Sequence, residues 1–335
     1  MICALFRISA FLCCILMAAC SQDEGDTETL RIGHFPNVTH VQALVARSMA
    51  RNGDGWFEKY LPGIKIEWYS FNAGPSAMEA IFGKTIDASY VGPSPAINAY
   101  AISRGREVRL LSGAVDGGAA LLVHDGASMK SGRDFSGKTV ATPQLGNTQD
   151  ISARAWLKRS GLHITREGGG DTHVTPTSNS MQLPLFQRGD LDAVWTVEPW
   201  VSRLEREAGA RVLVEDTAVV TTVLVAREAW LREHPERAAR LVKAHEDLTQ
   251  WILDHPREAQ KMVADELSLL MRSPMDLSLV ETSWKRLKPT TNLNMKGMKQ
   301  FVRDAQSAGL LGRVPPLDGM KARLPSPSSQ IPSQP

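Results

Sequence analysis

The sequence predicts an α/β protein with two lobes, and three observations support this fold class. Short apolar or β-branched runs alternate with amphipathic stretches from Leu30 to about residue 214, as in strands joined by helices. The segment Ile-Asp-Ala-Ser-Tyr at 86–90 is matched by Leu-Asp-Ala-Val-Trp at 191–195, each followed by a proline and a further helical stretch. The length of 335 residues suggests roughly two domains. We therefore expect two similar lobes rather than a single sheet.

The first lobe is predicted to begin with residues 30–115. Its expected strands are 30–33, 64–71, 88–91 and 108–112, and its expected helices are 39–52, 76–82 and 95–104. Ser76 and Glu79 have capping-box spacing at the start of the second of these helices. Strands separated by helices at this spacing favour a mainly parallel sheet with helices on both faces.

Residues 116–216 are predicted to form the second lobe. Its expected strands are 120–123, 139–142, 172–177, 193–197 and 212–214, and its expected helices are 151–157, 181–188 and 199–208. The apolar, β-branched run 219–226 then suggests a return to the first sheet. Residues 217–320 are therefore expected to complete the first lobe, with mostly helical sequence from 230 to 311 that is broken at four prolines.

Both ends of the chain are predicted to lie outside the lobes. Residues 8–19 form an apolar run that is shorter than the ~20 residues of a membrane-spanning helix and that ends like a secretory signal. Its last residues, Met17-Ala18-Ala19-Cys20, resemble a bacterial lipobox, which implies a signal peptide over 1–20, a lipidated Cys20 and a tether over 21–29. A simple cleaved signal also fits. The Pro/Ser/Gln-rich tail, 321–335, should be disordered.

The composition argues against several functional classes. The net charge is only +2, so no nucleic-acid partner is implied. All four cysteines fall within the first 20 residues, and the eight histidines show no metal-ligand spacing. A nucleophile elbow, a Walker phosphate loop and a Gly-x-Gly-x-x-Gly fingerprint are all missing from the sequence. We therefore expect no catalytic residues, no metal site and no cofactor.

The stretch 142–150 is the strongest candidate for a ligand-binding element. It runs from a predicted strand through a turn into a predicted helix, which begins near Asn147, Thr148 and Gln149. The first-turn amides of a helix lack intrahelical acceptors, and the helix dipole adds partial positive charge, so such a start can bind an anion. The alternative is that Asn147 or Thr148 only caps an ordinary helix.

Further polar groups fall at other strand ends and at the crossover between the lobes. These candidates are Asn37, Thr39 and His40 after the first strand, Ser94 after the third, Gly117 and Gly118 at the crossover, and Trp195 and Glu198 in the second lobe. Ligands of α/β sheets bind beyond the carboxyl ends of the strands, so we expect these residues to line one cleft. The helix starts at His40, Ser94 and Asn147 are expected to face that cleft, and their unpaired amides favour an anionic ligand.

Three of these candidates have an alternative role that the residues alone leave open. Trp195 either covers an apolar part of the ligand or belongs to the core. His40 could equally be solvated or cap a helix. Glu198 could act as a base or simply be a polar residue of the cleft wall.

From about Leu30 to Leu311 the chain resembles the substrate-binding proteins of nitrate/sulfonate/taurine-type ABC importers. The segments that carry the resemblance are 90–96, 142–148, 193–200 and 251–259. The resemblance implies a type II periplasmic binding protein fold, in which two lobes close over a small solute and present it to a membrane permease and its ATPase. It also implies that Ser94 and the turn at Asn147 and Thr148 contact the anionic head of the ligand.

The expected function is therefore that of an exported, membrane-anchored and monomeric solute receptor for an alkanesulfonate, taurine or a similar small organic anion. Many relatives have a cationic Lys-Gly-Ser-Thr-like turn where this chain has Leu145-Gly146-Asn147-Thr148, so a particular sulfonate specificity does not transfer. One alternative is an enzyme on the same fold, similar to proteins that synthesise the thiamine pyrimidine precursor. Others are a receptor for a pyrimidine, nitrate or bicarbonate, and a sensor that passes its ligand to a signalling partner.

Overall fold

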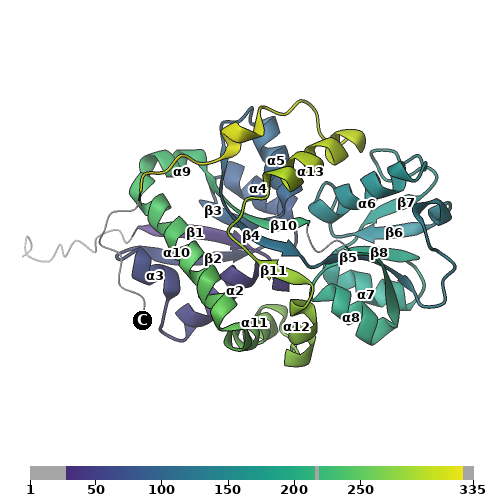
Figure 1. Ribbon diagram of the computed structural model, residues 1–335, viewed down its shortest axis with the longest axis horizontal. Coiled ribbons are helices and arrows are strands. Elements are labelled where there is room, and N and C mark those ends of the chain that lie inside the picture. The colour runs from purple at the N-terminus through teal and green to yellow at the C-terminus, as the bar shows by residue number, and fades with distance from the viewer. Residues whose placement is uncertain (1–27, 216–218, 327–335) are drawn as a thin grey trace, which may run out of the picture.

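The computed structural model describes residues 28–215 and 219–326. The predicted signal peptide with Cys20, residues 21–27 of the tether and residues 327–335 of the tail lie outside the described residues. Two α/β lobes lie side by side, each built on its own sheet (Figure 1). Within the described ranges, no helix combines the length and the apolar character needed to cross a membrane.

The first sheet contains six strands and is mixed. Its order is β11 (Leu287–Pro289), β4 (Val108–Gly117), β10 (Val220–Arg227), β3 (Ala88–Val91), β1 (Thr29–His34) and β2 (Lys65–Ser70). Strand β1 runs parallel to β2 and β3, whereas β10 runs antiparallel to both β3 and β4. The apolar run after residue 218 thus enters the centre of the first sheet, where all its residues are buried.

Helices cover both faces of the first sheet. One face packs against α2 (Val41–Arg51), α3 (Trp56–Tyr60), α9 (Glu228–Glu233), α10 (Pro235–Asp254), α11 (Pro256–Met271) and α12 (Leu277–Trp284). The other packs against α4 (Gly74–Phe82), α5 (Pro93–Ile102), α13 (Met295–Ser307) and the 3₁₀ turn η3 (Leu317–Met320). Because both faces are covered, β3 and β10 are buried along their whole length, polar residues such as Ser89 and Thr222 included.

The second sheet contains five strands. Its order is β7 (His173–Pro176), β6 (Thr139–Thr142), β8 (Ala193–Val197), β5 (Ala119–His124) and β9 (Ala210–Glu215). Helix α6 (Thr148–Arg159) and the 3₁₀ turn η2 (Gly132–Phe135) cover one face, and α7 (Asn179–Gln187) and α8 (Trp200–Ala208) cover the other. Because β6 pairs in parallel with β7 and β8, the carboxyl ends of all three strands lie at the edge of the sheet that faces the first lobe.

The matching segments 86–90 and 191–195 occupy equivalent places in the two sheets. Asp87 precedes β3 and accepts the backbone N–H of Arg31 in β1, at 3.1 Å. Asp192 precedes β8 and accepts the backbone N–H of Thr139 in β6, at 2.8 Å. Each aspartate also pairs with basic side chains, Asp87 with Arg31 and Arg227, and Asp192 with Lys138. The short sequence match therefore reflects a repeated structural unit.

The chain crosses from the first sheet to the second at Gly117 and Gly118. Their φ angles are +76° and +77°, a left-handed conformation that glycine adopts without strain. The expected lobe boundary after residue 115 falls inside β4, because Asp116 and Gly117 still pair with β11. The second sheet ends at Glu215 and the first resumes at Val220.

Several local predictions differ from the structure. Pro289, one of the four prolines expected to break the helical stretch 230–311, instead ends the edge strand β11, where a missing N–H is tolerated. The capping box at Ser76 does not form, because α4 begins at Gly74 and Ser76 Oγ instead contacts the side chain of Gln144. The tail from 321 onward was predicted to be disordered, but Ala322 donates its N–H to Leu110 O at 2.8 Å. The first residues of the tail are therefore paired with β4.

Candidate functional site: a pocket between the lobes

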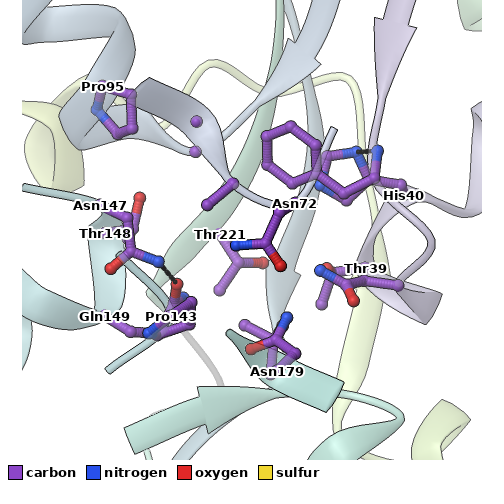
Figure 2. Close-up of a pocket in the computed structure, with 16 residues that line it drawn as sticks. Thr39, His40, Asn72, Pro95, Pro143, Asn147, Thr148, Gln149, Asn179 and Thr221 are labelled. Carbon is purple, nitrogen blue, oxygen red and sulfur yellow. Dashed lines mark hydrogen bonds between the residues drawn. The ribbon is translucent and has the colours of Figure 1, made fainter. Parts of the chain in front are cut away.

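A pocket lies between the two lobes, at the carboxyl ends of the parallel strands (Figure 2). The first lobe contributes Phe35, Asn37, Thr39, His40, Asn72, Ala73, Gly74, Gly92, Pro95 and Thr221. The second lobe contributes Pro143, Asn147, Thr148, Gln149, Asn179 and Val197. The space between atoms is about 360 Å³, but the centre of a water molecule can reach only about 20 Å³ of it. The pocket is therefore narrow, with room for about one water as the lobes stand.

Five helix starts converge on this inter-lobe pocket. In the first lobe they are His40 before α2, Gly74 of α4, and Gly92 before α5. In the second lobe they are Thr148 of α6 and Asn179 of α7. The first-turn amides of each helix have no acceptor within that helix, and the positive end of each helix dipole lies at the pocket. The site therefore favours negative charge without using a basic side chain.

In several side-chain amides of the pocket, the oxygen already accepts a hydrogen bond from the protein. Asn37 Oδ1 accepts from Trp200 Nε1 at 3.1 Å, and Asn179 Oδ1 accepts from the hydroxyl of Thr196 at 3.3 Å. Gln149 Oε1 accepts from Asn147 Nδ2 at 3.1 Å (Figure 2). Because each oxygen is held by the protein, the NH₂ groups of Asn37, Gln149 and Asn179 are the ends left for a ligand. The pocket is thus rich in donors.

Two buried hydroxyls near the pocket have no hydrogen-bond partner. Thr148 is 3% exposed and Ser94 is 5% exposed, and neither side-chain oxygen is paired. An unpaired buried hydroxyl costs about 1–3 kcal/mol, so a ligand that satisfies it gains that amount. Thr148 lines the pocket itself, whereas Ser94 faces an adjacent crevice between α5, α6 and α13.

Among the lining residues that the structure describes, His40 is the only titratable side chain, and none of the others is charged. Burial lowers its pKa well below the ordinary value, and the nearby His34 lowers it further. The imidazole is therefore neutral. Its Nδ1 accepts the backbone N–H of Phe35 at 3.4 Å, which places the proton on Nε2. His40 thus presents one more neutral donor.

Trp195 lies beside the pocket rather than in it. Residues 193, 195 and 197 of β8 point to the same face of the sheet, so Trp195 sits one step deeper than Val197, which lines the pocket. The indole packs edge-on against Trp156, with 6.1 Å between ring centroids, and belongs to the core cluster of the second lobe. One part of it borders a small second cavity together with Thr148 and Gln149.

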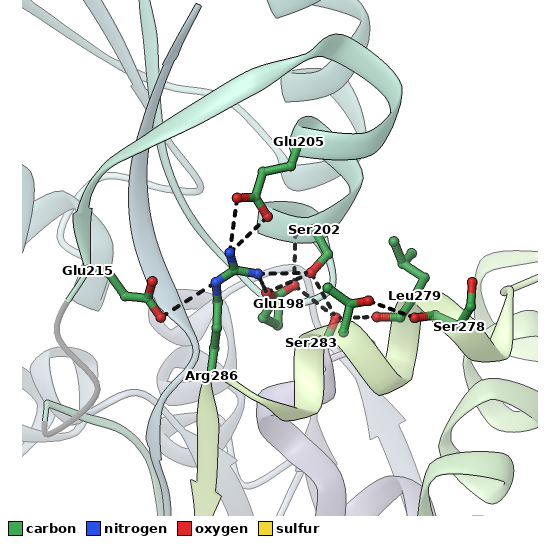
Figure 3. Close-up of polar contacts among 9 residues, drawn as sticks. Glu198, Ser202, Glu205, Glu215, Ser278, Leu279, Ser283 and Arg286 are labelled. Carbon is green, nitrogen blue, oxygen red and sulfur yellow. Dashed lines mark hydrogen bonds and ion pairs between the residues drawn. The ribbon is translucent and has the colours of Figure 1, made fainter. Parts of the chain in front are cut away.

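Glu198 does not line the pocket. Its carboxylate accepts hydrogen bonds from Ser202 and Ser283, and it pairs with Arg286 at 3.2 Å (Figure 3). Burial raises the pKa of Glu198, while the bonds from Ser202 and Ser283 and the charge of Arg286 oppose that rise. All partners of its side chain are protein groups, so Glu198 joins the lobes instead of facing a ligand.

The backbone of Glu198 also connects the lobes. Its carbonyl accepts the N–H of Val38 in the first lobe at 3.0 Å, and its N–H donates to Gly118 O at 2.8 Å. Gly117 and Gly118 lie behind the pocket wall, where Gly117 O accepts the hydroxyl of Thr221 at 2.7 Å. The crossover glycines and Glu198 therefore position lining residues and do not line the pocket themselves.

Sequence reasoning missed three polar residues of the pocket. Asn72 follows β2, Asn179 follows β7, and Thr221 lies near the start of β10. The first two stand where a parallel strand leads into the next helix, as Asn37 and Asn147 do. A search for polar residues at every strand-to-helix connection would have found Asn72 and Asn179. Thr221 gave no local signal, because it belongs to a strand that returns from the second lobe.

The structure offers no site for a metal ion among its described residues, since no three His, Cys, Asp or Glu side chains are grouped there.

Comparison with known proteins identifies the family. A family model described as NMT1-like matches residues 23–268, most of the chain. The chain belongs to the NMT1-like family.

Individual relatives of this NMT1-like protein agree with that assignment. A Bacillus subtilis protein described as an aliphatic sulfonates-binding protein is 26% identical over 241 residues, which are 68% of each chain. The alkanesulfonate-binding protein of Xanthomonas axonopodis pv. citri, solved with MOPS bound, has a TM-score of 0.68 at 20% identity, covering 85% of this chain and 94% of that one. The nitrate-binding protein of Synechocystis PCC 6803 has a TM-score of 0.70 at 14% identity, covering 85% and 83%. These structures share the periplasmic binding protein fold with the chain, as the sequence predicted.

Proposed function

We propose that this NMT1-like protein is the solute receptor of an ABC importer, binding a small organic anion such as an alkanesulfonate or taurine and delivering it to a permease and its ATPase. The ligand class follows the names of the sulfonate-binding relatives. The proposed ligand contacts are Asn37, Thr39, His40, Asn147, Thr148 and Gln149 from the sequence, together with Asn72 and Asn179. Ser94, Gly117 and Gly118 support the site from behind.

One observation carries the proposal. The described lining residues of the inter-lobe pocket offer many hydrogen-bond donors and no charged side chain, and five helix starts border the pocket. A sulfonate has three acceptor oxygens and a single negative charge, which suits a ring of neutral donors. A pocket between two lobes also suits a receptor whose lobes move apart to admit a ligand and then enclose it.

Calorimetry with the purified full chain tests this proposal. Methanesulfonate, ethanesulfonate, taurine, nitrate, bicarbonate and a pyrimidine are titrated separately, and melting temperatures are recorded with each. A ligand of the native state raises the melting temperature by mass action. We expect heat and a raised melting temperature with sulfonates. Binding of a neutral pyrimidine alone, with no response to any anion, would refute the proposal.

We also propose that the protein binds its ligand without transforming it. A reaction centre needs a nucleophile or base placed against the substrate. His40 has its Nδ1 engaged with Phe35, and Glu198 is enclosed by protein partners. Prolonged incubation of the bound ligand followed by NMR should return it unchanged. A new resonance that grows in proportion to protein concentration would instead support the enzyme alternative.

Finally, we propose that the protein is exported, acts as a monomer and is anchored through a lipidated Cys20. The motif Met17-Ala18-Ala19-Cys20 supports the anchor. Replacing Cys20 with Ala should move the protein from the membrane fraction to the soluble periplasmic fraction. If the C20A variant stays with the membranes, the anchor lies elsewhere.

A further inference from the structure

We propose that the crevice between α5, α6 and α13 is a second ligand site, and that it takes a small amphiphilic carboxylate, an anionic head group on a short apolar tail. The three helices come from both lobes and lie next to one another (Figure 1). The crevice and the inter-lobe pocket share none of their described lining residues. The inference therefore goes beyond the proposed function and does not depend on it.

The crevice is larger than the inter-lobe pocket. The centre of a water molecule can reach about 150 Å³ of it, compared with about 20 Å³ of the pocket. That space holds about ten waters, or a ligand of similar size. Further along α6 and α13, Arg159 pairs with Asp304 at 2.9 Å, and Lys158 Nζ donates to Ser307 O. These contacts hold together the two helices that form opposite walls of the crevice.

Ser94 supplies a buried donor to the crevice. It is the second residue of α5, it is 5% exposed, and its hydroxyl has no hydrogen-bond partner. Pro93 and Pro95 on either side have no N–H, so Ser94 is the only one of the first three residues of α5 that can donate. An oxygen of a ligand would satisfy the orphan hydroxyl, and the positive end of the helix dipole favours a charged oxygen there.

Arg166 supplies positive charge. Its guanidinium is exposed at the crevice and forms no hydrogen bond or ion pair with a described residue. None of the described lining residues carries a carboxylate. Nearby acidic groups are engaged or face elsewhere, since Asp150 is held by Arg154 and by the N–H of Gly146, and Glu167 lines a different cavity. A free guanidinium can bind a carboxylate through two parallel hydrogen bonds.

The rest of the wall is largely apolar. Ile151 of α6 and Ala305 of α13 are buried, Leu310 and Leu311 follow α13, and Leu145 on the turn before α6 is 42% exposed. An alkyl tail that covers these side chains removes apolar area from water, and binding tightens in proportion to the area covered. A carboxylate with a short alkyl tail therefore matches both the polar and the apolar part of the crevice.

Calorimetry of the purified full chain with hexanoate tests the inference. Hexanamide has the same shape without the charge, and it should bind about tenfold more weakly, because hydrogen bonds to a charged group are the stronger ones. Butanoate lacks two methylene groups and should bind at least about fourfold more weakly than hexanoate. The absence of hexanoate binding at millimolar concentration, or equal affinities for hexanoate and hexanamide, would overturn the inference.

Two substitutions determine whether hexanoate occupies the crevice. Ser94→Ala removes the orphan hydroxyl, so hexanoate affinity should fall at least about tenfold while the melting temperature of the free protein does not fall. Arg166→Gln should weaken hexanoate about three- to fivefold, as expected for an exposed ion pair. Arg133→Gln is the matched control, because Arg133 is also exposed on the second lobe but lies outside the crevice. We expect R133Q to change the affinity less than twofold.

The outcomes separate this inference from the proposed function. Hexanoate affinity that is unchanged in both S94A and R166Q places hexanoate outside the crevice and overturns the inference. Competitive displacement of hexanoate by a sulfonate means that both occupy one pocket, which also overturns it. If hexanoate binds with the expected dependence on Ser94 and Arg166 but no sulfonate binds, the inference stands and the proposed function fails. Melting curves establish that each variant is folded before binding is compared.

Discussion

Gly92 of the first lobe and Thr148 of the second lobe touch across the closed cleft. A Cβ atom added at Gly92 would lie 2.2 Å from Thr148 Oγ1 and 3.3 Å from Thr148 Cβ. Real Cβ contacts are never that short, so any side chain at this position holds the starts of α5 and α6 apart. The contact between these two residues therefore limits how far the lobes can close.

Replacing Gly92 with Ala should prevent full closure. We expect ligand affinity to fall at least about tenfold, the cost of roughly 1.4 kcal/mol of lost contacts, with a melting temperature of the free protein close to that of the wild type. Calorimetry and small-angle scattering with and without ligand measure both effects. Gly169→Ala is the control, because a Cβ there meets nothing closer than 3.7 Å. Normal closure of the G92A protein would contradict the prediction.

Replacing Thr148 with Val should weaken ligand binding without harming the fold. The hydroxyl has no partner within the protein, so removing it relieves an unsatisfied buried group. A hydrogen bond to a charged ligand group contributes about 1.5–3 kcal/mol, so affinity should fall between about tenfold and 150-fold. Calorimetry gives the affinity and a melting curve gives the stability. An unchanged dissociation constant would remove Thr148 from the ligand contacts.

Acid should destabilise the fold through its buried histidines. Burial lowers the pKa of His34 to about 3 and of His245 to about 4, and lowers that of His40 well below 6.5. Below about pH 6.5 the histidines of the unfolded chain bind protons, whereas the buried histidines of the native state do not. The free energy of unfolding is therefore highest above pH 6.5 and decreases as the pH falls below it. Each histidine contributes about 1.4 kcal/mol per pH unit, and Glu198, whose raised pKa acts in the opposite sense, reduces the total.

Urea denaturation at pH 7, 6 and 5 measures that slope. His245→Gln provides a matched variant, because a glutamine can accept from Tyr90 OH and donate to Gly113 O as the imidazole does. The variant should have a slope shallower by about 1.4 kcal/mol per pH unit. Equal slopes in the two proteins would mean that His245 is not a neutral buried group.

Arg286 should be essential for the junction between the lobes. It pairs with Glu198, Glu205 and Glu215, all from the second lobe, and Glu198 is fully buried (Figure 3). Arg286→Gln leaves that carboxylate without its cation, which should cost about 3–5 kcal/mol in urea denaturation. Arg206→Gln, which breaks an exposed pair with Asp276, should cost less than about 1 kcal/mol. Similar losses in both variants would contradict the special role of Arg286.

The fold was predictable from local sequence because each element obeys a local rule. Strand 139–142 and strand 193–197 have the predicted bounds, since buried strands read as short apolar runs between turn residues. The edge strand β11 was not predictable, because its three residues pair with β4 only once the chain has returned from the second lobe. Ser76 was misread for a similar reason: its partner Gln144 belongs to the other lobe.

The site was predictable only in part. Asn37, Thr39, His40, Asn147, Thr148 and Gln149 line the pocket because each follows a strand that ends at the cleft. Glu198 and Tyr90 also stand at strand ends, but their side chains turn elsewhere, Glu198 to Arg286 and Tyr90 to His245. The direction of a side chain depends on partners far away in the sequence, and no local pattern encodes them.

The neutral walls of the pocket have a consequence for how the protein responds to its medium. A receptor that attracts its ligand with a lysine or an arginine loses affinity and speed of capture as salt rises, because mobile ions screen that attraction over a Debye length of about 8–10 Å. Dipoles that act only at contact, inside a closed cavity, are hardly screened. Ligand binding by this chain should therefore remain almost constant from dilute to saline surroundings.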